Sequence, residues 1–220
     1  MTTTGAAGLR VRGLRRGGPA PLHGDFDARP GETTALLSAD GSGAALLLAA
    51  LGLEPAAAGT SDIAGHRLVD DGRALGGDGR PVAVLGPAPV VSPRRTVGEQ
   101  LAAASGRAGA CCADPIALAG SYGLEAVAET PAGELPLAMQ HRLALGLAVA
   151  GGPRLVAAIA PWDGLAAREA GLLEGIARVA ADECGFAFVH ATAVPARGAR
   201  MNPCSSSARC SFSAATRLSP

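Results

Sequence analysis

A strand, a glycine-rich turn and a helix follow one another near residue 40, and this succession constrains the fold more than any other feature. The apolar run Thr34–Leu37 predicts a short buried strand, and the continuously apolar stretch Ala44–Leu53 predicts a helix. The turn between them contains Gly41 and Gly43. Such a turn directs backbone N–H groups and the positive end of a helix at one point, as in a phosphate-binding loop. The sequence therefore predicts an α/β domain that carries the scaffold of an anion site.

The charged chemistry of a phosphate-binding loop is missing from this turn. A working loop has the pattern G-x-x-x-x-G-K-[ST], whose lysine contacts phosphates and whose hydroxyl contacts magnesium. In that register Ser38 replaces the first glycine, Ala44 the lysine and Ala45 the hydroxyl residue. All 19 cationic residues are arginine, so no lysine elsewhere in the chain can replace the missing one. By position, the nucleotide-binding residues of the turn are Ser38, Asp40, Gly41, Ser42, Gly43, Ala44, Ala45 and Leu46.

Length and charge leave room for one α/β domain and exclude some partners. At 220 residues the chain can form one such domain with a small helical insertion. The formal net charge is zero, which gives no reason to expect nucleic acid or an anionic membrane as a partner. No secretory signal is evident, and the longest apolar runs are too short to span a bilayer. We therefore expect a cytoplasmic protein that reaches the inner face of the cell membrane only through a partner.

The remaining reactive side chains form no pattern typical of a metal site. The five cysteines have neither metal-ligand spacing nor the arrangement of a disulfide framework, so we expect unpaired thiols. His141 and Arg142 are expected on the surface of a helix, and Trp162 is expected to be a packed or interface aromatic residue.

Further elements can be placed from their periodicity and capping residues. Alternating or apolar runs predict strands at Leu9–Arg12, Leu22–Ala28, Val82–Leu85, Leu155–Ile159 and Phe186–Val189, and a hairpin at Gly59–Leu68. Helices are expected after the capping box that begins at Thr96, and at Ala113–Tyr122, Leu137–Val149 and Leu165–Ala181. Residues 191–220 show no sustained periodicity and predict a disordered tail, a composition that a reading frame shift would also produce.

The order and spacing of these segments resemble the nucleotide-binding domain of ABC transporters over about residues 9–190. The matching segments are Arg29–Glu32 before the loop strand, Gly59–Gly65, Val91–Val97, Arg142–Pro153, Pro161–Leu165 and Val189-His190. The resemblance implies a mixed α/β sheet of the P-loop NTPase type with flanking helices, an antiparallel β subdomain and a small helical subdomain at about residues 90–150. It implies one domain at 1–190, followed by the tail at 191–220.

Most residues that the resemblance makes functional are absent from their positions. The glutamine that senses the metal falls at Pro87, the magnesium-binding aspartate at Ile159 and the catalytic glutamate at Ala160. His190 alone keeps its type, as a remnant of the switch histidine. The signature motif falls on Leu135, Pro136, Leu137, Ala138 and Met139.

These losses predict a degenerate ABC-type subunit without ATPase activity, which acts through contacts with a transporter membrane subunit or a second, active ATPase subunit in a dimer. ATP and Mg²⁺ would be cofactors only if residual family activity persists, and no other metal is implied. Two alternatives stay open at this point. One is a divergent but active ATPase that completes its site with a partner, and the other is a decaying gene product without function.

Overall fold

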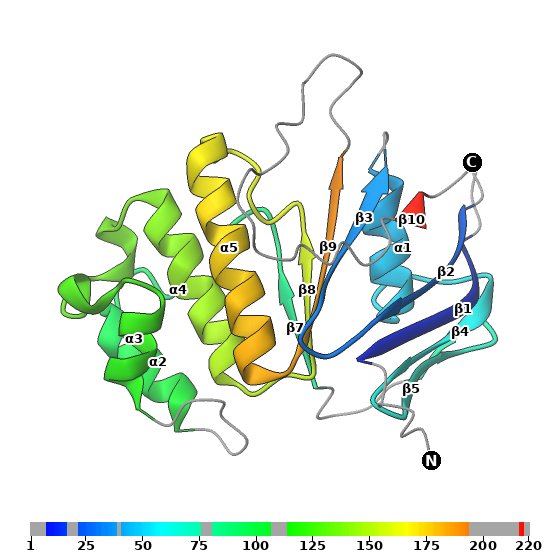
Figure 1. Cartoon of the computed structure of the whole chain (residues 1–220), viewed down its shortest axis with the longest axis horizontal. Coiled ribbons are helices and arrows are strands. Elements are labelled where there is room, and N and C mark those ends of the chain that lie inside the picture. Colours follow the sequence, from blue (N-terminus) through cyan, green and yellow to red (C-terminus); the bar gives the residue numbers. More distant parts are fainter. Residues whose placement is uncertain are drawn as a thin grey trace, which may run out of the picture.

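The computed structural model describes residues 8–16, 22–38, 41–75, 81–106, 114–193 and 216–217. Within these residues, two sheets and a group of helices lie side by side, with the antiparallel sheet and the helical group at opposite ends (Figure 1). The predicted mixed α/β class is confirmed. In the part of the chain that is described, no helix is long and apolar enough to cross a membrane.

The central sheet is parallel and has the strand order β10-β3-β9-β8-β7. Its strands are β3 (Thr33–Ser38), β7 (Val82–Leu85), β8 (Leu155–Ile159), β9 (Ala187–Ala193) and β10 (Thr216–Arg217). The interior strand β8 is apolar on both faces, because helices or a second sheet cover each side. The predicted strands at β7 and β8 are confirmed with their bounds.

Strand β9 extends further than the sequence indicates. The expected strand ends at His190, whereas Ala191, Thr192 and Ala193 continue the ladder and pair with Leu36, Leu37 and Ser38 of β3. This pairing with β3 extends the strand although the local sequence pattern is weak. Of the expected tail at 191–220, residues 191–193 belong to β9, and residues 216–217 form β10, which pairs with β3. Its other residues lie outside the described part.

The second sheet is antiparallel and has the order β2-β1-β4-β5-β6. Its strands are β1 (Leu9–Arg16), β2 (Leu22–Ala28), β4 (Ala58–Ile63), β5 (His66–Asp70) and β6 (Arg73–Ala74). The predicted hairpin is confirmed: its two turn residues, Ala64 and Gly65, both have positive φ (48° and 87°), as a tight hairpin turn requires.

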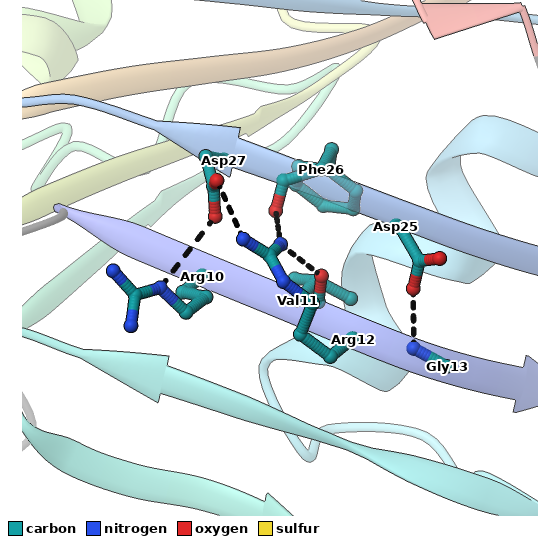
Figure 2. Close-up of polar contacts among 7 residues, drawn as sticks. All are labelled: Arg10, Val11, Arg12, Gly13, Asp25, Phe26 and Asp27. Carbon is teal, nitrogen blue, oxygen red and sulfur yellow. Dashed lines mark hydrogen bonds and ion pairs between the residues drawn. The ribbon is translucent and has the colours of Figure 1, made fainter.

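Ion pairs and a bulge shape the outer face of this sheet (Figure 2). The Arg12 guanidinium lies 2.6 Å from the Asp27 carboxylate, and Arg10 lies 3.8 Å from the same residue. The β1–β2 register shifts between Val11 and Leu14, where Gly13 has φ 54° and donates its N–H to the Asp25 carboxylate. These charges are exposed, so each pair contributes little to stability.

Helix α1 (Ser42–Ala50) is the element that joins the two sheets. Its residues Leu46, Leu47, Ala49 and Ala50 are buried in one cluster with Leu9, Val11 and Leu36 from the strands on either side. A helix covered on two sides needs no polar face, which explains why its sequence is apolar throughout.

Four further helices in the described part lie on the other side of the parallel sheet, of which the last two contact its strands and the first two pack further out (Figure 1). They are α2 (Val97–Ser105), α3 (Pro115–Ser121), α4 (Leu137–Ala150) and α5 (Ala167–Cys184), with short 3₁₀ turns at η1 (Glu125–Val127) and η2 (Ala132–Glu134). The predicted capping box is confirmed, since Thr96 Oγ1 accepts from the Glu99 N–H and Glu99 accepts from the Thr96 N–H. Cys184 forms a disulfide bond, contrary to the expectation of unpaired thiols; the other four cysteines lie outside the described residues.

Candidate functional site

The turn from β3 into α1 uses its own hydroxyl to satisfy a backbone donor. Gly41 is the N-cap residue of the helix and has φ 77°. As a glycine, it has no side chain that could accept a hydrogen bond from the first turn. The Ser38 hydroxyl, 6% exposed, accepts a hydrogen bond from the Gly43 N–H at 3.0 Å. The Ala44 N–H donates to the Gly41 carbonyl at 3.1 Å. Two of the helix's first N–H groups, which would otherwise be available to an anion, are thereby engaged within the turn.

Glycine is needed at position 43 because the chain approaches β3 closely there. A Cβ at this position would lie 3.1 Å from the Leu36 carbonyl oxygen and 3.3 Å from Ser38 Oγ. This close approach is what brings the Ser38 hydroxyl within reach of the Gly43 N–H. The second glycine of the predicted loop therefore has a packing role, whether or not a phosphate binds.

The next residues present only methyl and isobutyl groups. Ala44 and Ala45 are half-buried in the first turn of α1, and Leu46 is fully buried beneath them. These side chains can neither donate a hydrogen bond nor carry a charge. Ser42 is half-buried at the start of the helix. Asp40, the acidic residue expected in the turn, lies outside the described residues.

The sheet brings the end of β8 to the same edge as this turn. Ile159 pairs with Ala191 of β9, and Ala191 pairs with Leu36 of β3, so the carboxyl ends of the three strands are adjacent. Ile159 packs against the cluster that contains α1. Ala160 follows with φ 43°, an unusual value for a residue with a Cβ, and its N–H donates to the Ala191 carbonyl at 2.9 Å. Ile159 and Ala160, the two positions at which the resemblance implies carboxylates, thus lie at the same edge of the sheet as the turn.

His190 lies on the other face of the sheet. Its ring stacks on Phe188 with centroids 5.8 Å apart, and Phe188 belongs to the cluster under α5. Its neighbours Val189 and Ala191 belong to the α1 cluster, as the alternation of a strand requires. His190 Nε2 lies 3.9 Å from the Glu174 carboxylate of α5. Burial lowers the pKa of His190, and the charge of Glu174 partly opposes this shift. The structure therefore does not bring the imidazole to the loop.

The remaining predicted positions lie apart from the turn. Pro87 is exposed in the segment after β7, beside the end of β8. Leu135 is buried at the end of η2, and Pro136 precedes α4. Leu137, Ala138 and Met139 form the first turn of α4, and the cluster that Leu135 and Met139 contact is the one under α4 and α5.

Two residues behave differently from the sequence prediction. His141 was expected on a helix surface, but it is 3% exposed and burial lowers its pKa. It is buried because α4 has neighbours on several sides, and the sequence does not show which of the adjacent polar residues Gln140, His141 and Arg142 these neighbours cover. The role of Ser38 as an internal hydrogen-bond acceptor was also missed; the sequence signal was a hydroxyl residue five positions before a glycine.

Solved structures share this arrangement of two sheets and a helical group. An ATP-binding subunit of an ABC transporter has a TM-score of 0.64 and 20% identity over 84% of this chain and 79% of that chain. CbiO1 from Clostridium perfringens, part of the ABC transporter complex cbiONQ, has a TM-score of 0.69 and 16% identity over 86% and 79%. The chain has the fold of the ATP-binding subunits of ABC transporters.

A third solved structure with this fold is an ABC transporter in an inward-facing conformation, with a TM-score of 0.64 and 16% identity over 85% of this chain and 73% of that chain. No family model matches the sequence, and a search of curated proteins gave no match. The likeness to the ABC ATP-binding subunits therefore establishes the fold that the order of segments predicts, while the chemistry has to be judged from the site itself.

Proposed function

We propose that the chain is an ABC-type subunit without ATPase activity, which acts through contacts with a transporter membrane subunit or with an active ATPase subunit. The observation that carries this proposal is the apolar character of the edge where a nucleotide would be held. Ala44, Ala45, Ile159 and Ala160 stand where lysine, hydroxyl and carboxylate groups are required.

The first supporting step concerns the affinity for ATP. A hydrogen bond to a charged group contributes about 1.5–3 kcal/mol, so each lost contact weakens binding by roughly tenfold to more than a hundredfold. Losing the lysine, the hydroxyl and the aspartate together would move a micromolar dissociation constant to the millimolar range or beyond, even without full additivity. The internal bonds of Gly43 and Ala44 reduce the backbone contribution further.

The second step concerns hydrolysis. A positioned general base typically contributes about 10²–10⁴ in rate, and Ala160 has no group that can accept a proton. His190 cannot replace the carboxylate from its position, because its ring contacts Phe188 and Glu174 on the α5 side of the sheet. Among the described residues, no group of three histidine, cysteine, aspartate or glutamate side chains could hold a metal ion.

A role through contacts is consistent with a scaffold that is kept while its chemistry is lost. The turn packs β3 against α1, since Leu36, Leu46 and Leu47 are fully buried in one cluster. CbiO1 is part of a transporter complex. By analogy, we expect this chain to co-purify with a membrane subunit or an ATPase subunit encoded beside its gene when the two are co-expressed.

Phosphate release from Mg-ATP tests the proposal. We expect the purified chain to release no phosphate from ATP in a magnesium-dependent way. Its rate should equal that of the Ala160→Ser variant, a control that changes the same position without adding a carboxylate. Release by the wild-type chain that disappears in Ile159→Asn would contradict the proposal, because the active site would then include this edge. Release that appears only with a co-expressed partner, and that depends on Ile159, would favour the composite-site alternative.

A further inference from the structure

Two Asp-Gly dipeptides lie in turns of the described part of the chain, and their backbones are held differently. One is Asp71-Gly72, between β5 and β6, and the other is Asp163-Gly164, in the turn after β8. Both aspartates are exposed. In such a dipeptide the aspartyl side chain can react with the next backbone nitrogen, because glycine has no Cβ to hinder the approach. The other Asp-Gly pairs, at 40–41 and 78–79, include residues outside the described part.

The backbone of Asp71-Gly72 is held at the nitrogen that would have to react. The two residues form the loop between two paired strands, and both have positive φ (45° and 76°). The Gly72 N–H donates to the Gly59 carbonyl oxygen at 2.9 Å. A Cβ at Gly72 would lie 2.7 Å from the Ala58 nitrogen, so the backbone of β4 packs directly against this glycine. Reaction here requires a hydrogen bond to break and a packed loop to move.

Asp163-Gly164 has neither restraint. The surrounding turn is closed by two bonds of 3.1 Å, from the Asp163 N–H to the Ala160 carbonyl and from the Leu165 N–H to the Trp162 carbonyl. Gly164 lies between them with φ 88°, and its Cβ position faces open space. Within the described residues, the Gly164 N–H has no acceptor and the Asp163 carboxylate has no partner. The two groups that would react are therefore both free and adjacent.

We propose that Asp163-Gly164 is a site of spontaneous isoaspartate formation. The Gly164 nitrogen attacks the side-chain carboxyl carbon of Asp163, which reacts in its protonated form. The N–H proton and the carboxyl hydroxyl leave as water, and a five-membered succinimide ring remains. Water then opens the ring at one of its two carbonyl carbons. Opening at the side-chain carbonyl restores aspartate, and opening at the main-chain carbonyl gives isoaspartate.

The product changes the backbone close to the candidate site. Isoaspartate adds one carbon to the main chain and turns the former backbone carbonyl of Asp163 into a free carboxylate. The modified bond follows Ala160 by three residues, in the turn that the Ala160 carbonyl helps to close. The reaction depends on the exposed turn alone, so it is independent of whether ATP binds, and either proposal can fail without the other.

The wild-type chain provides its own comparison. The purified protein is kept folded at neutral pH and physiological temperature for several weeks and is then digested with trypsin. Isoaspartate is located by fragmentation in the peptides 155–168 and 68–73, and an isoaspartyl methyltransferase with labelled S-adenosylmethionine confirms it. Conversion at Asp163 should exceed that at Asp71 by about threefold to tenfold, the factor that one backbone hydrogen bond supplies.

Two matched variants measure the same ring closure by mass. Asp163→Asn and Asp71→Asn each place a side-chain amide at an exposed position, and ring closure then expels ammonia instead of water. The hydrolysed product is heavier than the starting amide by one mass unit, so the rate can be followed on the intact chain. In the folded chain Asp163→Asn should lose ammonia about threefold to tenfold faster than Asp71→Asn. In urea the two rates should converge, because Gly72 then loses its bond to Gly59.

Equal rates at the two sites of the folded chain, or a faster rate at Asp71, would overturn the proposal. A difference that persists undiminished in urea would overturn it as well, because the local sequence and not the folded turn would then set the rate. If either asparagine variant does not fold by circular dichroism, the comparison of the two peptides from the wild-type chain decides the question.

Discussion

At the scale of single residues, the turn from β3 into α1 combines an internal hydrogen bond with the apolar side chains of Ala44 and Ala45. The departure of Ala44 and Ala45 from the phosphate-binding pattern could be recognised from the sequence, because it is a matter of residue type. The bond from the Gly43 N–H to Ser38 could not, because it depends on a distance of 3.0 Å set by the packing of β3 on α1. The same holds for His141, whose burial depends on every element around α4.

Replacing Ser38 with alanine tests this internal bond. The Ser38→Ala variant leaves the buried Gly43 N–H without an acceptor, so the free energy of unfolding should fall by about 1–2 kcal/mol. Ser121→Ala is the matched control, since its hydroxyl bonds the Ala117 carbonyl at an exposed position of α3 and should cost under about 0.5 kcal/mol. Urea unfolding of both variants measures the difference. Equal losses would mean that the Ser38 bond has no special role.

Ala160 stores backbone strain that can be released. Its φ of 43° lies in the left-handed region, which costs a residue with a Cβ about 1–2 kcal/mol and costs glycine much less. After the larger chain entropy of glycine is subtracted, Ala160→Gly should raise the free energy of unfolding by about 0.5–1 kcal/mol. In the helical first turn of α4, Ala138→Gly should instead lower it by up to about 1 kcal/mol. If urea unfolding shows Ala160→Gly to be the less stable protein, the conformation at this turn is not strained.

At the scale of elements, local periodicity located most strands but not where they end. The bounds of β7 and β8 follow from short apolar runs. The end of β9 does not, because Ala191, Thr192 and Ala193 join the strand by pairing with β3, a contact far away in the sequence. That extension places His190 within the strand and, by alternation, under α5. A residue-by-residue motif match cannot reveal which face of a sheet a histidine occupies.

The position of His190 between β9 and α5 makes stability depend on pH. Burial holds the pKa of His190 below about 6.5, its value in an unfolded chain, and the same is true of His141. Below about pH 6.5 the unfolded chain therefore binds more protons than the folded one, and the free energy of unfolding falls as the pH decreases. Urea midpoints at about pH 7.5 and about pH 5.5 should show this loss.

Two variants assign this loss to the buried ring. His190→Gln should reduce the difference between the two midpoints, whereas His66→Gln removes an exposed imidazole of β5 and should leave it as in the wild type. Glu174→Gln should enlarge the difference, because the attraction that opposes the pKa shift is removed. A pH dependence unchanged in His190→Gln would show that other groups cause it.

At the scale of the whole molecule, the order of segments predicted the fold well. The antiparallel sheet, the parallel sheet and the helical group all occur, and α1 is held between the two sheets. The order is informative because each segment has a characteristic length and position, even where its motif residues have changed. At the candidate site, the sequence indicated only the apolar residue types at Ala44, Ala45, Ile159 and Ala160, and the internal hydrogen bonds required the three-dimensional arrangement.

The central claim, that this ABC-type fold has lost nucleotide binding, is tested most directly by calorimetric titration of Mg-ATP. We expect the wild-type chain to bind no more tightly than about 1 mM. The variant with Ala44→Lys, Ala45→Ser, Ile159→Asp and Ala160→Glu should bind at least about tenfold more tightly, while Ala117→Lys, a lysine on the exposed side of α3, should not. Micromolar binding by the wild-type chain would contradict the account.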